Sequence, residues 1–319
     1  MDRREAWSAL AARPGVAGAL GAMAIAFSGI LVRLADVSPS TAAVFRCLYA
    51  LPPLAVLAWW ERQRFGPRPI RQRQLAWIAG VFFALDLVFW HNSIAYVGAG
   101  LATVLGNMQV VLVAFLAWVF LREPVGWRLV AAIGVVVAGV VLISGVLEEG
   151  AFGSNPALGV LFGALTSLAY AGFILVLRQG NRDIRRPAGP LFDATAVATV
   201  ASAAAGLVLG ELDLAPGWEE TGWLVLLALT AQVAGWLLIS VSLPRLPAAL
   251  TSVILMIQPV ASVALSMAIL GEAPSGLQLA GVGLVLTGVL IATAGRRPAR
   301  PAKEPAPPPE AATVQQPAG

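Results

Sequence analysis

The sequence predicts an all-α membrane protein with ten transmembrane helices, arranged as two inverted five-helix repeats. Of its 319 residues 58% are hydrophobic and only 12% are charged, with a mean hydropathy of +0.80, whereas an ordinary soluble domain is about 25% charged. Two further observations support this fold class. The few charges lie in short patches between long apolar runs, and the second half of the chain resembles the first.

Ten apolar runs are long enough to cross a hydrocarbon core about 30 Å thick, which takes roughly 20 residues per helix. In chain order the expected spans are 15–33, 41–59, 75–96, 99–120, 127–146, 157–177, 190–210, 222–242, 247–270 and 276–294. The loops between them are too short to hold a folded domain. We therefore expect the protein to act within the membrane.

The basic residues predict the orientation, because short cytoplasmic loops of membrane proteins are rich in Arg and Lys. With the N-terminus inside, all of the 21 basic residues except Arg33 and Arg46 fall on the cytoplasmic side. We expect a multi-pass protein of a plasma membrane, the bacterial inner membrane, with both termini in the cytoplasm. The basic loops are explained by this topology and by anionic lipid, and we expect no nucleic-acid partner.

The spans divide the chain into five segments. Residues 1–14 form a cytoplasmic arm, 15–146 the first repeat, 147–156 an outer linker, 157–294 the second repeat, and 295–319 a cytoplasmic tail. The tail is rich in Pro and Ala, a composition that cannot form a packed core, and we expect it to be disordered.

The internal repeat is carried by polar residues and glycines, which match less often by chance than apolar ones. The aligned pairs are Leu121-Arg122-Glu123-Pro124 with Leu270-Gly271-Glu272-Ala273, Gln109 with Gln258, Asp86 with Gln232, and Trp90 with Trp236. Because each half has an odd number of helices, the second half enters the membrane upside down relative to the first. Such repeats place a binding site near the midplane and permit alternating access.

The two Glu-containing turns, the Gln258-Pro259 element and the Gly-rich fifth helix of each half resemble the drug/metabolite transporter superfamily, EamA type. The resemblance covers roughly residues 15–295. It implies a ten-helix transporter of small molecules whose halves surround a central cavity, and many bacterial members transport outward. It also implies that Glu123 and Glu272 are chiefly structural.

Four polar side chains lie near the middle of the expected spans, where an ionised group costs about 2.5–3.5 kcal/mol. They are Asp86, Gln109, Gln232 and Gln258, from two pairs of repeat-related helices. We predict that they form a substrate-binding site at the midplane.

Three ionisable residues near this depth leave alternatives open. Asp86 takes up a proton or binds a cationic substrate group, or it pairs with Arg46 to fix helix packing. Arg46 extends to the interface, pairs with Asp86, or binds a substrate carboxylate through two hydrogen bonds. His91 is a second proton-coupling candidate, but it lies about 140° around the helix from Asp86, and a packing role is its alternative.

Aromatic and amide side chains complete the predicted site. Trp90, Trp236 and Tyr170 are candidate cavity walls, with helix packing as the alternative. Asn107 and Gln109 project about 200° apart on one helix, so only one can face the cavity squarely. The repeat favours Gln109, although Thr103 and Asn107 form a second polar stripe. Pro259 has no backbone donor and predicts a helix break, a feature that often marks transporter sites.

Together these features predict a secondary transporter that exports small metabolites such as amino acids by alternating access, driven by protons or by the substrate's own gradient. The alternative substrates are lipophilic organic cations or drugs, which would need only Asp86 and the aromatic rings. A non-transporting membrane scaffold is the alternative of another class. We expect the partners to be the substrate, the lipid bilayer and protons, and the protein to be a monomer or weak dimer.

The composition argues against other classes of protein. So little charge cannot solvate the surface of a soluble enzyme of this size. A single Cys47 and a single His91 leave no cysteine-based or two-histidine metal centre. There is no Walker motif for ATP hydrolysis. We expect no cofactor, no metal and no enzymatic activity.

Overall fold

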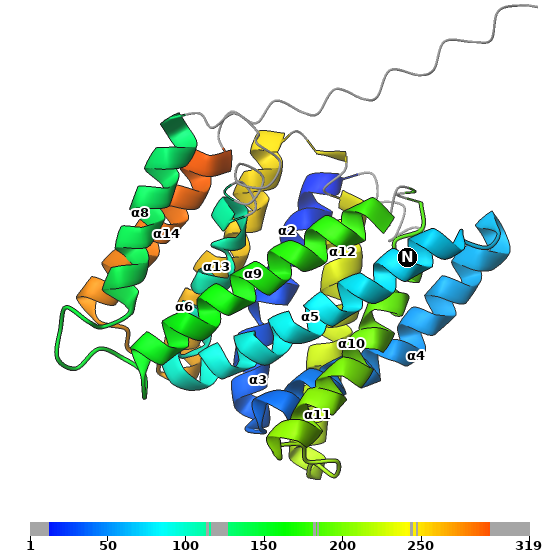
Figure 1. Ribbon diagram of the computed structural model, residues 1–319, viewed down its shortest axis with the longest axis horizontal. Coiled ribbons are helices and arrows are strands. Elements are labelled where there is room, and N and C mark those ends of the chain that lie inside the picture. Colours follow the sequence, from blue (N-terminus) through cyan, green and yellow to red (C-terminus); the bar gives the residue numbers. More distant parts are fainter. Residues whose placement is uncertain are drawn as a thin grey trace, which may run out of the picture.

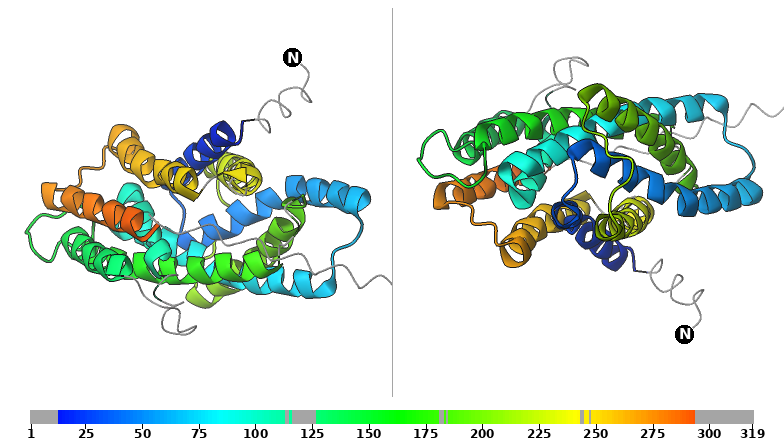
Figure 2. Two further views of the ribbon diagram at one scale, coloured as in Figure 1. Left: turned by 90° about the horizontal axis from the view of Figure 1, so that it is seen from above. Right: turned by 90° about the horizontal axis from the view of Figure 1, so that it is seen from below.

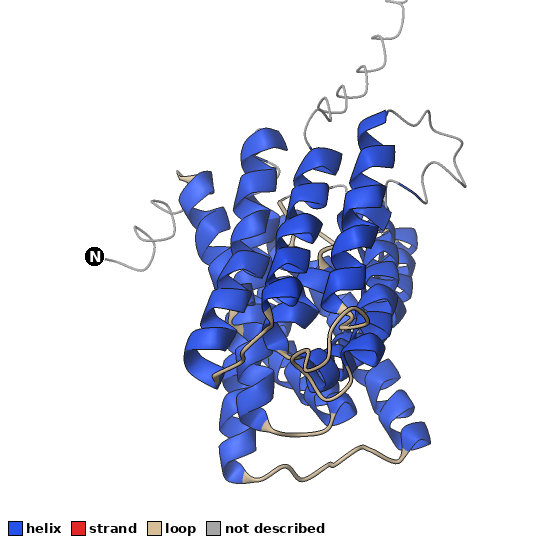
Figure 3. Cartoon of the chain, turned by 90° about the vertical axis from the view of Figure 1, so that its left-hand side faces the viewer, coloured by secondary structure: helices blue, strands red, loops and turns tan. Residues whose placement is uncertain are grey.

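The computed structural model describes residues 13–112, 115, 127–180, 183, 185–242, 245–246 and 248–293. Every regular element in this part of the chain is a helix (Figure 3). The expected C-terminal tail, the Leu121–Pro124 turn and nearly all of the expected N-terminal arm lie outside the described residues.

The first half begins with a span that is divided at Phe27, where the α-helical hydrogen bonding is interrupted. The described helices of the first half are α2 (Pro14–Ala26), α3 (Ser28–Ala35), α4 (Pro39–Phe65), α5 (Ile70–Val97), α6 (Ala99–Gly106) and α8 (Trp127–Ile143). Local sequence explains the boundaries. The Ser38 side chain accepts a hydrogen bond from the Thr41 backbone N–H, and Pro39 at the first position has no donor to leave unpaired. Gly98, with φ of 87°, separates α5 from α6.

The second half contains an unusual span that combines three elements, of which the middle one is a π-helix. Its helices are α9 (Pro156–Gly180), α10 (Ala188–Leu209), α11 (Trp218–Leu227), the π-helix η1 (Ala228–Gly235), α12 (Trp236–Ser242), α13 (Ala248–Leu270) and α14 (Gly276–Thr293). In the described residues, seven spans are long and apolar enough to cross a membrane, and three shorter apolar helices bring the total to the ten expected.

The helix contacts come in pairs that are related by exchanging the two halves. Three helices of the first half pack against the helix that holds the same position in the second half: α4 against α10, α6 against α13 and α8 against α14. The contact of α5 with α9 is mirrored by that of α11 with α3, and the contact of α5 with α10 by that of η1 with α4. Figure 1 shows α8 beside α14 at one edge of the molecule. The two halves are thus inverted repeats.

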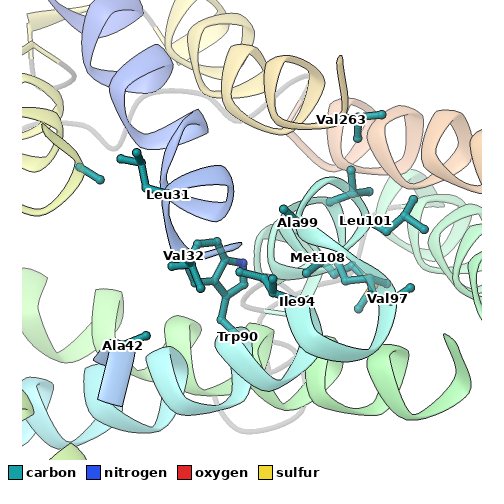
Figure 4. Packing of buried hydrophobic residues seen from close by; sticks show 14 of the residues in the cluster. Leu31, Val32, Ala42, Trp90, Ile94, Val97, Ala99, Leu101, Met108 and Val263 are labelled. Atoms are coloured by element: carbon teal, nitrogen blue, oxygen red, sulfur yellow. The ribbon is translucent and has the colours of Figure 1, made fainter. Parts of the chain in front are cut away.

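The bundle has two layers with the central region between them. Seen from above and below, α2, α12 and α13 lie on one side, and α5 and α9 lie on the other (Figure 2). A buried apolar cluster fills the space where α3, α5, α6 and α13 meet, and it includes Leu31, Val32, Ile94 and Leu101 (Figure 4). This cluster packs at the end of the bundle where α5 passes into α6.

A buried carboxylate reinforces the same end. Glu272 follows α13 and accepts hydrogen bonds from the backbone N–H groups of Ala99, at 2.7 Å, and Gly100, at 3.2 Å. These N–H groups begin α6 and have no partner within the helix. Because a carboxylate is favourable at a helix N-terminus, Glu272 ties the ninth span to the fourth.

Candidate functional site

A cavity of about 70 Å³ lies at the centre of the bundle, between the two layers of helices. Both halves of the chain contribute to its walls. The lining residues are Ile25, Ser28, Arg46, Phe83, Asp86, Leu87, Trp90, Thr103, Gly106, Asn107, Thr166, Tyr170, Trp236 and Gln258.

Seven of the residues predicted for the site line this cavity. They are Arg46, Asp86, Trp90, Asn107, Tyr170, Trp236 and Gln258. Gln109, Gln232, His91 and Pro259 are not among the lining residues, and the first three contact groups at or behind the wall, as described below.

Arg46 is hydrogen-bonded at its Nε but not at the end of its guanidinium group. Nε donates a hydrogen bond of 3.1 Å to Oε1 of Gln232, and the group lies 5.6 Å from the ring centroid of Trp90. The Gln232 amide in turn donates to Oγ1 of Thr195, at 3.3 Å. Gln232 is fully buried behind Arg46, so it positions the guanidinium. The two Nη groups of Arg46 have no hydrogen-bond partner in the described part of the chain.

Asp86 lines the same cavity, and the residue is 8% exposed. No hydrogen bond or close ion pair joins it to another residue within the described ranges. Arg46 acts on it electrostatically without the short contact that the packing interpretation would require. The cavity therefore presents an acidic group and a basic group that do not satisfy each other.

Aromatic rings form another part of the wall. The Trp236 ring lies nearly perpendicular to those of Phe173 and Tyr170, with centroids 5.5 and 6.0 Å away. Phe83 stacks on Phe173 at 4.7 Å. Edge-to-face and offset contacts of this kind are favourable, and they hold Trp236 and Tyr170 in fixed orientations at the cavity.

A polar stripe runs along α6 into the cavity. Oγ1 of Thr103 donates to the Ala99 carbonyl at 2.8 Å and accepts from Oγ of Ser262 at 3.0 Å, and the Asn107 amide donates to the Thr103 carbonyl at 2.8 Å. Asn107 lines the cavity, whereas Gln109 lies beside Tyr170 behind the wall, and its Oε1 is buried without a partner among the described residues. The repeat favoured Gln109 on the assumption of a regular helix, but α6 ends at Gly106 and a turn follows.

His91 and Pro259 have surroundings that differ from those of the cavity residues. The Nδ1 of His91 lies 3.1 Å from the Pro39 carbonyl, which fixes α5 to the start of α4. The predicted break at Pro259 does not end the helix, because α13 continues through it to Leu270. A proline removes one hydrogen bond, and the packing of α13 against α2 and α6 maintains the helix around it.

Several lining residues were missed by the sequence reasoning. Ile25 and Ser28 reach the cavity on either side of the break at Phe27, where the Ser28 hydroxyl donates to the Ile25 carbonyl at 2.6 Å. Thr166 is 2% exposed, and its Oγ1 has no partner among the described residues. Thr166 lies one helical turn before Tyr170, and this spacing was a signal that could have identified it.

Comparison with known proteins places the geometry in context. The family model described as "EamA-like transporter family" matches residues 13–145 and 157–294, one match in each half. A solved structure titled "Crystal structure of protein" matches with a TM-score of 0.58 and 17% identity, covering 88% of this chain and 98% of that chain. This similarity shows a shared fold. The search of curated proteins gave no match.

Proposed function

The chain belongs to the EamA-like transporter family, and we propose that it exports small zwitterionic metabolites such as amino acids through its central cavity. The family establishes a multi-pass membrane transporter. The substrate class and the direction of transport are our proposal.

The observation that supports a zwitterionic substrate is the pair of unsatisfied opposite charges in one cavity. The free Nη groups of Arg46 can bind a carboxylate through two parallel hydrogen bonds, the geometry for which a guanidinium is suited. The Asp86 carboxylate can accept hydrogen bonds from an ammonium group. A molecule that carries both groups would compensate both charges at once.

The size of the cavity agrees with a small substrate. A water molecule needs about 10–15 Å³ of such volume, so a cavity of about 70 Å³ holds about five water-sized groups. The amino and carboxylate groups with their shared carbon have this number of heavy atoms. The Trp236, Tyr170 and Phe83 rings would then face the substrate side chain.

A lipophilic cation fits this site less well. Asp86 and the aromatic rings would attract a cation, but the Arg46 guanidinium lines the same cavity and would repel it. An unpaired like charge of this kind is a typical device for rejecting a wrong ligand.

We propose that transport proceeds by alternating access, with protons moving through Asp86. The apolar cluster and the Glu272 hydrogen bond lie at the end where α5 meets α6, and we propose that they close this end. The distribution of arginines supports placing this end outside the bacterial inner membrane, with both termini in the cytoplasm and the cavity reached from the cytoplasm. The protein would act as a monomer or weak dimer.

Counterflow in proteoliposomes tests the substrate class. Vesicles are loaded with unlabelled alanine, and uptake of labelled alanine is challenged with its amide, its decarboxylated amine and tetraphenylphosphonium. We expect intact amino acids to compete and the compounds without a carboxylate to fail. Arg33→Gln, an exposed arginine outside the cavity, serves as the control for Arg46→Gln. Saturable transport of tetraphenylphosphonium without competition by amino acids would refute the proposal.

A further inference from the structure

A second pocket, separate from the central cavity, lies at the end of the bundle that carries most of the arginines. It has a volume of about 290 Å³ and lies between the end of α4, the loop to α5 and the start of α10. Four arginines and two acids line it, namely Arg62, Arg68, Arg73, Arg186, Glu61 and Asp193. The lining therefore has an excess of positive charge.

The two acids of this pocket are already engaged by the protein. Glu61 accepts hydrogen bonds from the backbone N–H groups of Ala188, at 2.9 Å, and Gly189, at 2.8 Å, which begin α10. Asp193 forms ion pairs with both Arg68 and Arg73. One carboxylate thus pairs with two guanidinium groups and compensates only one of their two charges. The remaining positive charge makes the pocket suited to an anion.

Arg68 has an unmet hydrogen-bonding group at this pocket. Its Nη2 donates to the Gly189 carbonyl at 2.9 Å and contacts Asp193, whereas its Nη1 is buried without a partner among the described residues. A buried guanidinium donor that is left unpaired costs free energy. A phosphate oxygen in the pocket would satisfy it.

An apolar groove continues from the pocket along the outer surface of α10. It has a volume of about 410 Å³ and is lined by Trp77, Ala196, Val197, Val200 and Ala204. Asp193 belongs to both the pocket and the groove. The Arg73 guanidinium lies 5.4 Å from the Trp77 ring centroid, so it also stands at the junction.

We propose that the pocket and the groove together bind one anionic phospholipid, with its phosphate at Arg62, Arg68 and Arg73 and an acyl chain along α10. The groove faces outward, where Val200 is 71% exposed, so it opens to the bilayer. Most of its lining side chains are alanine or valine, so the groove is apolar like an acyl chain. A free phosphate would use the pocket but not the groove. The arginines at this end belong to the face that the sequence predicts to be cytoplasmic, where anionic headgroups attract basic residues.

Native mass spectrometry of the detergent-purified full chain tests this site with three probes: phosphatidylglycerol, phosphatidylcholine and glycerol phosphate. We expect phosphatidylglycerol to bind at least tenfold more tightly than phosphatidylcholine. Each basic residue near an anionic headgroup contributes a factor of about five, so Arg62→Gln with Arg73→Gln should weaken binding about 25-fold. The matched control is Arg64→Gln with Arg71→Gln, which removes the same charge from exposed arginines that do not line the pocket.

A second pair of variants separates a lipid from a free phosphate. Ala204→Phe fills the groove on an exposed position and should lower phosphatidylglycerol binding about tenfold, whereas Val208→Phe, beyond the groove on the same helix, should not. Equal binding of the two lipids, or equal loss in the two arginine pairs, would overturn the proposal. The proposal would also be overturned if equimolar glycerol phosphate displaced phosphatidylglycerol and if phosphatidylglycerol bound normally to the Ala204→Phe variant.

Discussion

Substituting Arg46 by glutamine separates the two functions of this side chain. Glutamine has a nitrogen at the same number of bonds from Cα as the Nε of arginine. The shorter side chain can therefore keep the hydrogen bond to Oε1 of Gln232, which measures 3.1 Å in the native protein, and it loses the two Nη groups together with the positive charge. These are the groups that we propose bind the substrate carboxylate.

The size of the effect follows from the interaction that is removed. A single hydrogen bond to a charged group contributes about 1.5–3 kcal/mol, which corresponds to a factor of about 10 to 150 in affinity. Because Arg46→Gln removes both proposed hydrogen bonds, we expect the half-saturation concentration of the transported amino acid to rise at least about 10-fold. The melting temperature in detergent should change little, because Gln232 keeps its partner.

Arg46→Met provides the comparison that makes this reasoning falsifiable. Methionine cannot donate to Gln232, which is fully buried, and an unsatisfied buried acceptor costs about 1–3 kcal/mol. This variant should lose substrate affinity and thermal stability together. Counterflow in proteoliposomes gives the affinity and thermal unfolding in detergent the stability. The argument fails if Arg46→Gln transports with unchanged half-saturation, or if the two variants are destabilised equally.

Three further predictions follow from the same structure. Asp86→Asn keeps the shape of the side chain but cannot carry the proposed proton, so an imposed pH gradient should no longer accelerate transport; unchanged acceleration would remove Asp86 from this role. Gly98→Ala should lower the free energy of unfolding by about 1–3 kcal/mol, because φ at this position is 87° and the new Cβ would lie 2.8 Å from the Glu272 carboxylate. Gly134→Ala, which has open space around it, is the control, and thermal unfolding measures both variants. Gly106→Ala should fit, since its nearest contact is at 3.5 Å, whereas Gly106→Leu should fill the cavity and abolish counterflow with the melting temperature retained; normal transport by the leucine variant would contradict the location of the substrate.

The ten spans could be predicted because lipid imposes simple requirements on a sequence. A spanning helix must be long and apolar, and the chain meets this requirement at regular intervals. The repeat could be found because matching polar residues such as Gln109 and Gln258 are rare in apolar segments. These features depend on composition and spacing, which the sequence displays directly.

The arrangement of the site could be predicted only in part, because it depends on local departures from helical geometry. The internal repeat favoured Gln109 over Asn107 at the cavity, whereas Asn107 lines it in the structure, where a turn follows Gly106. The first span is divided at Phe27, just before the wall residue Ser28. No proline or charged residue near Phe27 predicts this break from the sequence. Contacts between distant helices, such as that of Arg46 with Gln232, have no signature in a single sequence.

The π-helix η1 makes the middle of the eighth span unlike its counterpart in the third. Its hydrogen bonds join residues five apart, so each turn holds more residues than an α-helical turn and the side chains shift around the axis. Gln232 lies within this loosely wound stretch and braces a neighbour, while Asp86, on ordinary α-helix, faces the interior. The two repeats thus share a fold, but their matched residues Asp86 and Gln232 have different roles. The first half carries the Asp86 carboxylate, which we propose contacts the substrate, and the second half holds the Arg46 guanidinium in position through Gln232.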